Sequence, residues 1–239
     1  MKEKYSIKEF CEIIEQLRGE NGCPWDREQT HESLRACMME EAAELVASVR
    51  ILKETGNCEN LREELGDVLL QVILHSQIAK EEGYFTLDDV VTEISRKMIR
   101  RHPHVFGSAV ADTKEAVVSN WDEIKRSEKS GMDATVAELS DLPLELPALV
   151  RAQKLSRKAE KVYGKKENYK ESLDHTKKLL HEWEEHGGDL SPEQQNKVIG
   201  ELLYSLSDMA QRKGIHAEQA LSDVVTAKIG DYQTFVKEN

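Results

Sequence analysis

Two pairs of acidic residues between positions 38 and 79 constrain the fold of this chain more than any other feature. Glu41 and Glu44 lie three residues apart in one helical pattern, and Glu64 and Asp67 do so in the next. Residues three apart are neighbours on the surface of a helix, so each pair can direct its carboxylates at one point. We therefore expect two adjacent helices that bring these carboxylates together.

The apolar residues around these acids suggest what the acids bind. Glu41 lies in the middle of a helical apolar stripe, and Asp67 opens a largely apolar run that extends to Ala79. Carboxylates beside such surfaces lose hydration, which is unfavourable unless a cation or strong hydrogen-bond donors replace the water. A hard divalent cation such as Mg2+ takes oxygen ligands and keeps water molecules for substrate phosphates. The alternative is that the acids form solvated helix faces, since 33% of the chain is charged. The apolar stripe that surrounds Glu41 consists of Leu34, Met38, Leu45, Val49 and Leu52.

The overall composition narrows the class of protein. Among 239 residues, 39% are hydrophobic and only 5% are aromatic, which favours packed helices over a sheet sandwich. The formal net charge of −12 argues against a general nucleic-acid-binding or anionic-membrane surface. The four cysteines form no C-x-x-C pair, no apolar leader opens the chain, and no apolar run is long enough to span a bilayer. We therefore expect a cytoplasmic protein with reduced thiols, and no nucleic-acid or membrane partner.

Apolar periodicity and helix-end signals predict an all-α fold, and no strand pattern rises above noise. Ser6, Thr30, Thr86 and Asp112 can cap helices, and Ser191-Pro-Glu-Gln194 combines a cap with Pro at the first helical position. Residues 21–26 contain Gly and Pro and predict a loop. The expected helices cover about residues 7–18, 30–55, 59–82, 86–102, 112–130, 148–163, 169–185, 192–213 and 217–237.

The second half of the chain is similar to the first half. Gly66-Asp-Val-Leu-Leu-Gln and Gly200-Glu-Leu-Leu-Tyr-Ser each lead through an amphipathic helix to a glycine and a further helix. The second copy loses most of the acids. The positions of Glu64 and Asp67 are occupied there by Val198 and Glu201. The positions of Glu40, Glu41 and Glu44 are occupied by Lys178, Leu179 and Glu182. We expect a unit that carries the chemistry over residues 1–130, a linker over 131–147 and a degenerate copy over 148–239. Generic helix patterning is the alternative explanation of the similarity.

Several stretches together resemble the MazG family of nucleoside triphosphate pyrophosphohydrolases, which are all-α enzymes. Glu40-Glu-Ala-Ala-Glu44 followed by Glu64-Leu-Gly-Asp67 is similar to the E-E-x-x-E and E-x-x-D signature of that family. The resemblance is clear over about residues 5–130 and weak over 145–239, so it implies two tandem MazG-like units with the second one degenerate. Further similar stretches are Gly22-Cys-Pro-Trp-Asp-Arg-Glu-Gln-Thr30, Arg100-Arg-His-Pro-His-Val-Phe106 and Trp121-Asp-Glu-Ile-Lys125.

The resemblance implies a reaction and a role for each matched residue. The reaction is Mg2+-dependent hydrolysis of a nucleoside triphosphate between the α and β phosphates, giving a nucleoside monophosphate and pyrophosphate. A homodimer would perform it in nucleotide-pool sanitation or regulation. Lys97 and Arg101, which are i and i+4 on one helix, would meet the phosphates. The metal ligands would be Glu41, Glu44, Glu64 and Asp67, with Glu40 supporting them or positioning water. The nucleotide would also contact Trp25, Arg100, Trp121 and Lys125.

The basic and aromatic residues also have structural explanations. Lys97, Arg100 and Arg101 could provide favourable charge near a helix C-terminus, and Trp121 could be a core or interface aromatic. His102 and His104 flank a proline and fit a structural turn better than a metal site.

Two other functions compete with the hydrolase. A di-iron helical bundle needs two Glu-x-x-His motifs, and only Glu28-Gln-Thr-His31 has that spacing. A non-catalytic module that binds nucleotide as a signal is the main alternative. No residue predicts a base or sugar preference.

Overall fold

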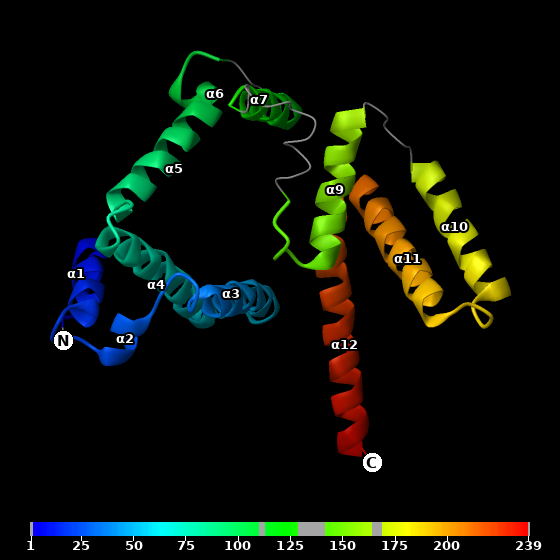
Figure 1. Cartoon of the computed structure of the whole chain (residues 1–239), viewed down its shortest axis with the longest axis horizontal. Helices are drawn as coiled ribbons and strands as arrows, with labels where there is room; N and C mark the ends of the chain where they lie inside the picture. Colours follow the sequence, from blue (N-terminus) through cyan, green and yellow to red (C-terminus); the bar gives the residue numbers. More distant parts are fainter. Residues whose placement is uncertain (1, 110–112, 129–141, 164–168, 239) are drawn as a thin grey trace. The chain divides into compact units, whose positions relative to one another are not determined.

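The computed structural model describes residues 2–109, 113–128, 142–163 and 169–238, and their regular structure is entirely α-helical (Figure 1). This confirms the expected all-α fold. The chain divides into two compact units, Met1–Lys125 and Arg126–Asn239. Within the described ranges, none of the helices combines the length and apolar character that a bilayer span requires.

Helices follow one another along both units with short connections. The first unit contains α1 (Ile7–Arg18), α2 (Pro24–Glu28), α3 (Arg35–Thr55), α4 (Glu59–Glu81), α5 (Leu87–Arg101), α6 (Pro103–Phe106) and most of α7 (Lys114–Ser127). The second unit contains α9 (Ala148–Tyr163), α10 (Tyr169–His186), α11 (Pro192–Arg212) and α12 (Ala217–Glu238).

Local sequence signals set most of the helix ends. Ser6, Thr86 and Ser191 cap their helices as expected, and each forms a capping box with the residue three positions later. Gly56 and Gly83 stop α3 and α4 in the left-handed conformation, with φ values of 73° and 75°, which an L side chain rarely adopts. These ends therefore follow from short-range rules.

Two ends differ from the sequence-based expectation. Thr30 does not cap α3; its hydroxyl accepts from the backbone N–H of Ser33 at 3.1 Å in a turn, and the helix begins at Arg35. The stretch expected to be a loop contains the short helix α2, which has Pro24 at its first position. The proposed cap Asp112 lies outside the described residues.

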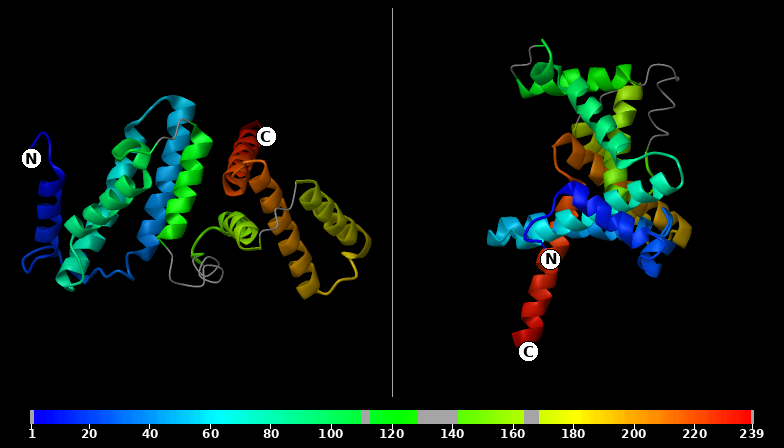
Figure 2. Two further views of the ribbon diagram at one scale, coloured as in Figure 1. Left: turned by 90° about the horizontal axis from the view of Figure 1, so that it is seen from above. Right: turned by 90° about the vertical axis from the view of Figure 1, so that its left-hand side faces the viewer.

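The core of the first unit lies where α4 packs on α3, α1 and α5. α3 and α4 form an antiparallel pair that lies side by side (Figures 1 and 2). The buried cluster consists of Ile14, Leu34, Ile73, Leu74 and Ile78. Fully burying one aliphatic side chain of this kind contributes about 1.5–3 kcal/mol to stability.

A buried arginine fastens α2 to this core. The side chain of Arg18, on α1, is only 5% exposed and pairs with Glu81 of α4 at 2.7 Å. Its guanidinium also donates to the backbone carbonyls of Asp26 and Gln29, at the end of α2. Arg18 therefore connects the neighbouring helices α1 and α2 to α4, which is distant in the sequence.

The second unit has a more polar core. α11 packs against both α9 and α10, and the carboxylate of Asp208 is buried between them. Asp208 accepts hydrogen bonds from the hydroxyls of Ser156 and Ser172 and from Nε of Arg212, the last at 2.8 Å. Because these donors satisfy the buried charge, they fix the relative positions of the three helices.

Candidate active site

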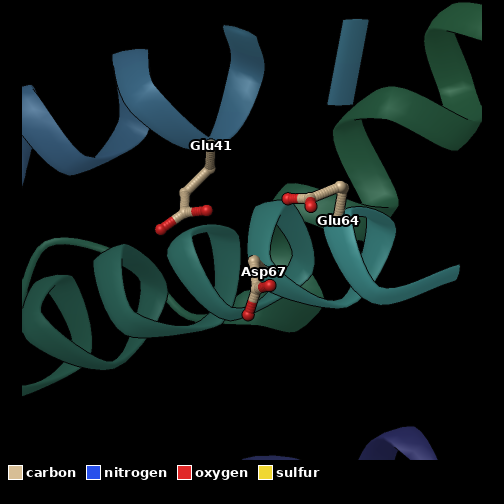
Figure 3. Close-up of side chains that lie close together, drawn as sticks. All are labelled: Glu41, Glu64 and Asp67. Atoms are coloured by element: carbon tan, nitrogen blue, oxygen red, sulfur yellow. The ribbon is translucent and has the colours of Figure 1, made fainter. Parts of the chain in front are cut away.

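Three acidic side chains from α3 and α4 converge in the first unit. One carboxylate oxygen each from Glu41, Glu64 and Asp67 lies within 4.8 Å of the others. Figure 3 shows Glu41 extending from α3 toward Glu64 and Asp67 on α4. The short connection after Gly56 folds α4 back along α3, and this packing lets Glu41 of α3 approach Glu64 and Asp67 of α4.

Burial and mutual repulsion act on the ionisation of these acids. Partial burial raises the pKa of the Glu41 carboxyl above its usual value of 4.5, and the charges of Asp67, Glu44, Glu64 and Glu40 raise it further. Glu64 is 8% exposed, and its Oε1 accepts a hydrogen bond from Nδ2 of Asn60 at 2.9 Å. Its other oxygen, Oε2, is buried and has no partner among the described residues.

These observations fit a hard divalent cation. Carboxylate oxygens are the ligands that Mg2+ prefers, and a cation would both satisfy Glu64 Oε2 and offset the repulsion felt by Glu41. Glu44 and Glu40 are exposed and lie outside the converging group, although both raise the pKa of Glu41. The structure thus brings together three of the four predicted ligands.

Three of the predicted phosphate- and nucleotide-binding residues, Lys97, Arg100 and Arg101, lie at the end of α5, where Arg101 contacts Trp121. The guanidinium carbon of Arg101 lies 5.4 Å from the ring centroid of Trp121 on α7, a cation–π arrangement. The His102 ring also contacts Trp121, with the two ring centroids 5.1 Å apart in an edge-on orientation. Lys97 is half-buried and Arg100 is exposed on the same helix. The side chain of Lys125 lies outside the described residues.

Trp25 and the two histidines around Pro103 have distinct placements. Trp25 is 73% exposed on α2, which packs against α1. Nδ1 of His102 lies 2.7 Å from the carbonyl of Met98, one turn earlier, which is the arrangement of a helix end. This contact agrees with the expected structural turn.

A pair of histidines beside the core was missed by the sequence analysis. Nδ1 of His31 lies 2.7 Å from Nδ1 of His75, and the two ring planes differ by only 4°. The ring centroids are 5.0 Å apart, and at the observed nitrogen–nitrogen distance one imidazole can donate a hydrogen bond that the other accepts. No signal in the sequence indicated this contact, because His31 lies in the turn before α3 and its position depends on how that turn packs on α4.

Comparison with known proteins identifies the family. The sequence model described as the MazG nucleotide pyrophosphohydrolase domain matches residues 29–106, a range that contains all three converging carboxylates. The nucleoside triphosphate pyrophosphohydrolase/pyrophosphatase MazG of Thermotoga maritima is 36% identical over 219 residues, which cover 90% of this chain and 79% of that protein. The nucleoside triphosphate pyrophosphohydrolase of Escherichia coli K12 is 35% identical over 218 residues, or 90% of this chain and 81% of that protein.

A third relative is longer. The uncharacterized protein YabN of Bacillus subtilis is 46% identical over 153 residues, but these make up 64% of this chain and only 30% of that protein. The resemblance seen in the sequence motifs is confirmed by these matches. The chain belongs to the MazG family of nucleoside triphosphate pyrophosphohydrolases.

Proposed function

We propose that this protein is a Mg2+-dependent enzyme that hydrolyses nucleoside triphosphates between the α and β phosphates, releasing a nucleoside monophosphate and pyrophosphate. Family membership supports the reaction class. The observation that carries the assignment is the convergence of Glu41, Glu64 and Asp67 around a buried, unpartnered oxygen of Glu64.

The acidic residues hold the cation in this proposal. When bound, Mg2+ supplies charge neutralisation, polarisation of a phosphoryl oxygen and an activated water. Glu41, Glu64 and Asp67 provide oxygen ligands, and Glu44 completes the set from the next turn of α3. Glu40 is exposed beside Glu41 and orients the attacking water. Because the pKa of Glu41 is raised, binding of the cation displaces a proton from this site at mildly acid pH.

The basic and aromatic residues bind the rest of the nucleotide in this proposal. Lys97 and Arg101 share a face of α5 and stabilise the charge on the leaving pyrophosphate, which carboxylates cannot do. Trp121, held by Arg101, stacks on the base, and its ring face tolerates different bases. Trp25, Arg100 and Lys125 complete the nucleotide contacts.

We assign the chemistry to the first unit and a structural or regulatory role to the second. In the described residues, the only group of three metal-binding side chains is the one on α3 and α4. Glu201, the counterpart of Asp67, instead lines a cavity of about 470 Å³ beside the Asp208–Arg212 ion pair. The proposed domains remain residues 1–130 and 148–239, and much of the linker 131–147 lies outside the described residues.

We also propose a cytoplasmic homodimer that acts in nucleotide-pool sanitation or regulation. Apolar side chains flank the acidic group on α3 and α4 and are at least half exposed, as expected of a surface that a second copy covers. They are Met39, Val46, Val49 and Leu65.

The test is an assay of purified protein with Mg2+ and a panel of nucleoside triphosphates, scored for pyrophosphate against orthophosphate. Pyrophosphate as the direct product supports the proposal, and orthophosphate as the direct product contradicts the cleavage position. Tight nucleotide binding without turnover would instead indicate the non-catalytic binding module.

A further inference from the structure

Gln71 on α4 carries a buried polar atom that the fold does not explain. The residue is 4% exposed, and its amide oxygen Oε1 has no hydrogen-bond donor among the described residues. Leaving a buried acceptor unpaired destabilises a protein, whereas an apolar side chain of similar size would not carry this penalty. The core residues Leu74 and Ile78 continue the same helix, so an apolar side chain would suit the surroundings.

Gln71 lies on the helix face that carries the acidic site. It is one turn after Asp67 and two turns after Glu64, and residues at these spacings share a face. With about 1.5 Å of rise per residue, Gln71 lies roughly 6 Å along the axis from Asp67. Glu64 Oε2 and Gln71 Oε1 are therefore two buried, unpartnered acceptors on either side of Asp67.

We propose that Gln71 belongs to the metal site and accepts a hydrogen bond from a water molecule in the hydration shell of the cation held by Glu41, Glu64 and Asp67. This inference rests on the proposed function. Mg2+ keeps several of its water molecules, which lie about 2.1 Å from the ion. A further hydrogen bond of about 2.8 Å extends the reach of the site to about 5 Å, a distance that a glutamine one turn away can span.

The second unit provides an internal comparison. Its counterpart of Gln71 in the alignment of Gly66 with Gly200 is Ser205, which is also buried. There the hydroxyl has a partner, Thr176 Oγ1 at 2.7 Å. The polar atom at this position is thus satisfied within the unit that lacks the acidic group, and is unsatisfied in the unit that has it.

The test combines Gln71→Leu with a matched control, Gln211→Leu. Gln211, on α11, also has a buried Oε1 without a partner among the described residues, but it lies in the second unit. In EDTA, both substitutions should preserve or raise the melting temperature, because each removes an unpaired acceptor. With Mg2+ alone, Gln71→Leu should weaken the cation's Kd by about 10–100-fold, as loss of outer-sphere partners does, while Gln211→Leu should match the parent protein.

Each other outcome contradicts the inference. Titration calorimetry with Mg2+ alone that gives the same Kd for Gln71→Leu and the parent would show that Gln71 does not contact the hydration shell. If Gln71→Leu leaves the Kd for Mg2+ unchanged but raises the KM for nucleotide, the hydrogen-bond donor to Gln71 is on the nucleotide and not on a metal-bound water. Failure of the proposed function gives a different result. The parent protein itself would then bind no Mg2+, or its Mg2+ binding would be unaffected by Asp67→Asn. Gln71→Met, an unbranched side chain of similar length, replaces the leucine variant if circular dichroism shows that the latter is unfolded.

Discussion

Replacing Glu41 with Gln should stabilise the protein in the absence of metal and remove its response to Mg2+. Two like charges 4.8 Å apart repel by about 0.9 kcal/mol in bulk water and by about 3.5 kcal/mol at an effective dielectric constant of about 20. Glu41 faces two such charges, on Glu64 and Asp67, and solvent screens them because Glu41 is only half-buried. We therefore expect a gain of roughly 1–2 kcal/mol, or about 3–12 °C in melting temperature for a unit of this size.

The assay is calorimetry of the parent and Glu41→Gln in EDTA and in Mg2+, at several pH values. The raised pKa of Glu41 means that the folded state holds its proton more tightly than the unfolded state does. The stabilisation by Gln should therefore be largest near pH 7, and it should disappear as the pH falls through the raised pKa toward 4.5, where Glu41 is neutral as well.

Glu63→Gln is the matched control, since Glu63 is an exposed acid on α4 beside Glu64. It should keep the parent's response to Mg2+. A Glu41→Gln variant that melts at a lower temperature than the parent in EDTA, or that gains as much stability from Mg2+, would refute the electrostatic argument.

Three further outcomes are expected. Asp67→Asn should lower kcat for pyrophosphate release at least 100-fold with unchanged helicity, and Glu201→Gln should change it less than twofold; equal losses would contradict the assignment of chemistry to the first unit. Burial, and secondarily its imidazole neighbour, lower the pKa of His75 from 6.5, so stability should fall as the pH drops below about 6.5, and His75→Phe should remove this dependence in thermal melts. Arg18→Ala should lower the free energy of unfolding in urea by about 2–4 kcal/mol, because it leaves Glu81 and two backbone carbonyls without their donor. A loss below about 1 kcal/mol would show that the contacts of Arg18 contribute little to stability.

Features set by neighbours in sequence could be predicted, and features set by distant contacts could not. The capping boxes at Ser6, Thr86 and Ser191 involve residues three positions apart, so the sequence alone predicts them. The short helix α2 depends on the guanidinium of Arg18, which reaches it from α1. The stretch was expected to be a loop because its Gly and Pro residues were interpreted as turn signals, although Pro24 is also favoured at the first position of a helix.

The acidic site shows the same division. The i, i+3 spacing predicted that Glu64 and Asp67 share a face, and the apolar stripe around Glu41 predicted that this face of α3 packs on the neighbouring helix. The exposure of Glu44 was not predictable, because it depends on how far α3 is rotated against α4. The exposed position of Trp25 could not be predicted either, since it depends on the tertiary placement of α2.

The acidic site lies within a single helical hairpin, residues 35–81, and this has a consequence for folding. Contacts between segments that are close in sequence need little loop-closure entropy, so the two helices can associate early, before the rest of the chain is in place. Mutual repulsion of the carboxylates slows that association, and Mg2+ in the folding buffer should accelerate it. Under the proposed function, the cation would thus also promote formation of the hairpin that binds it.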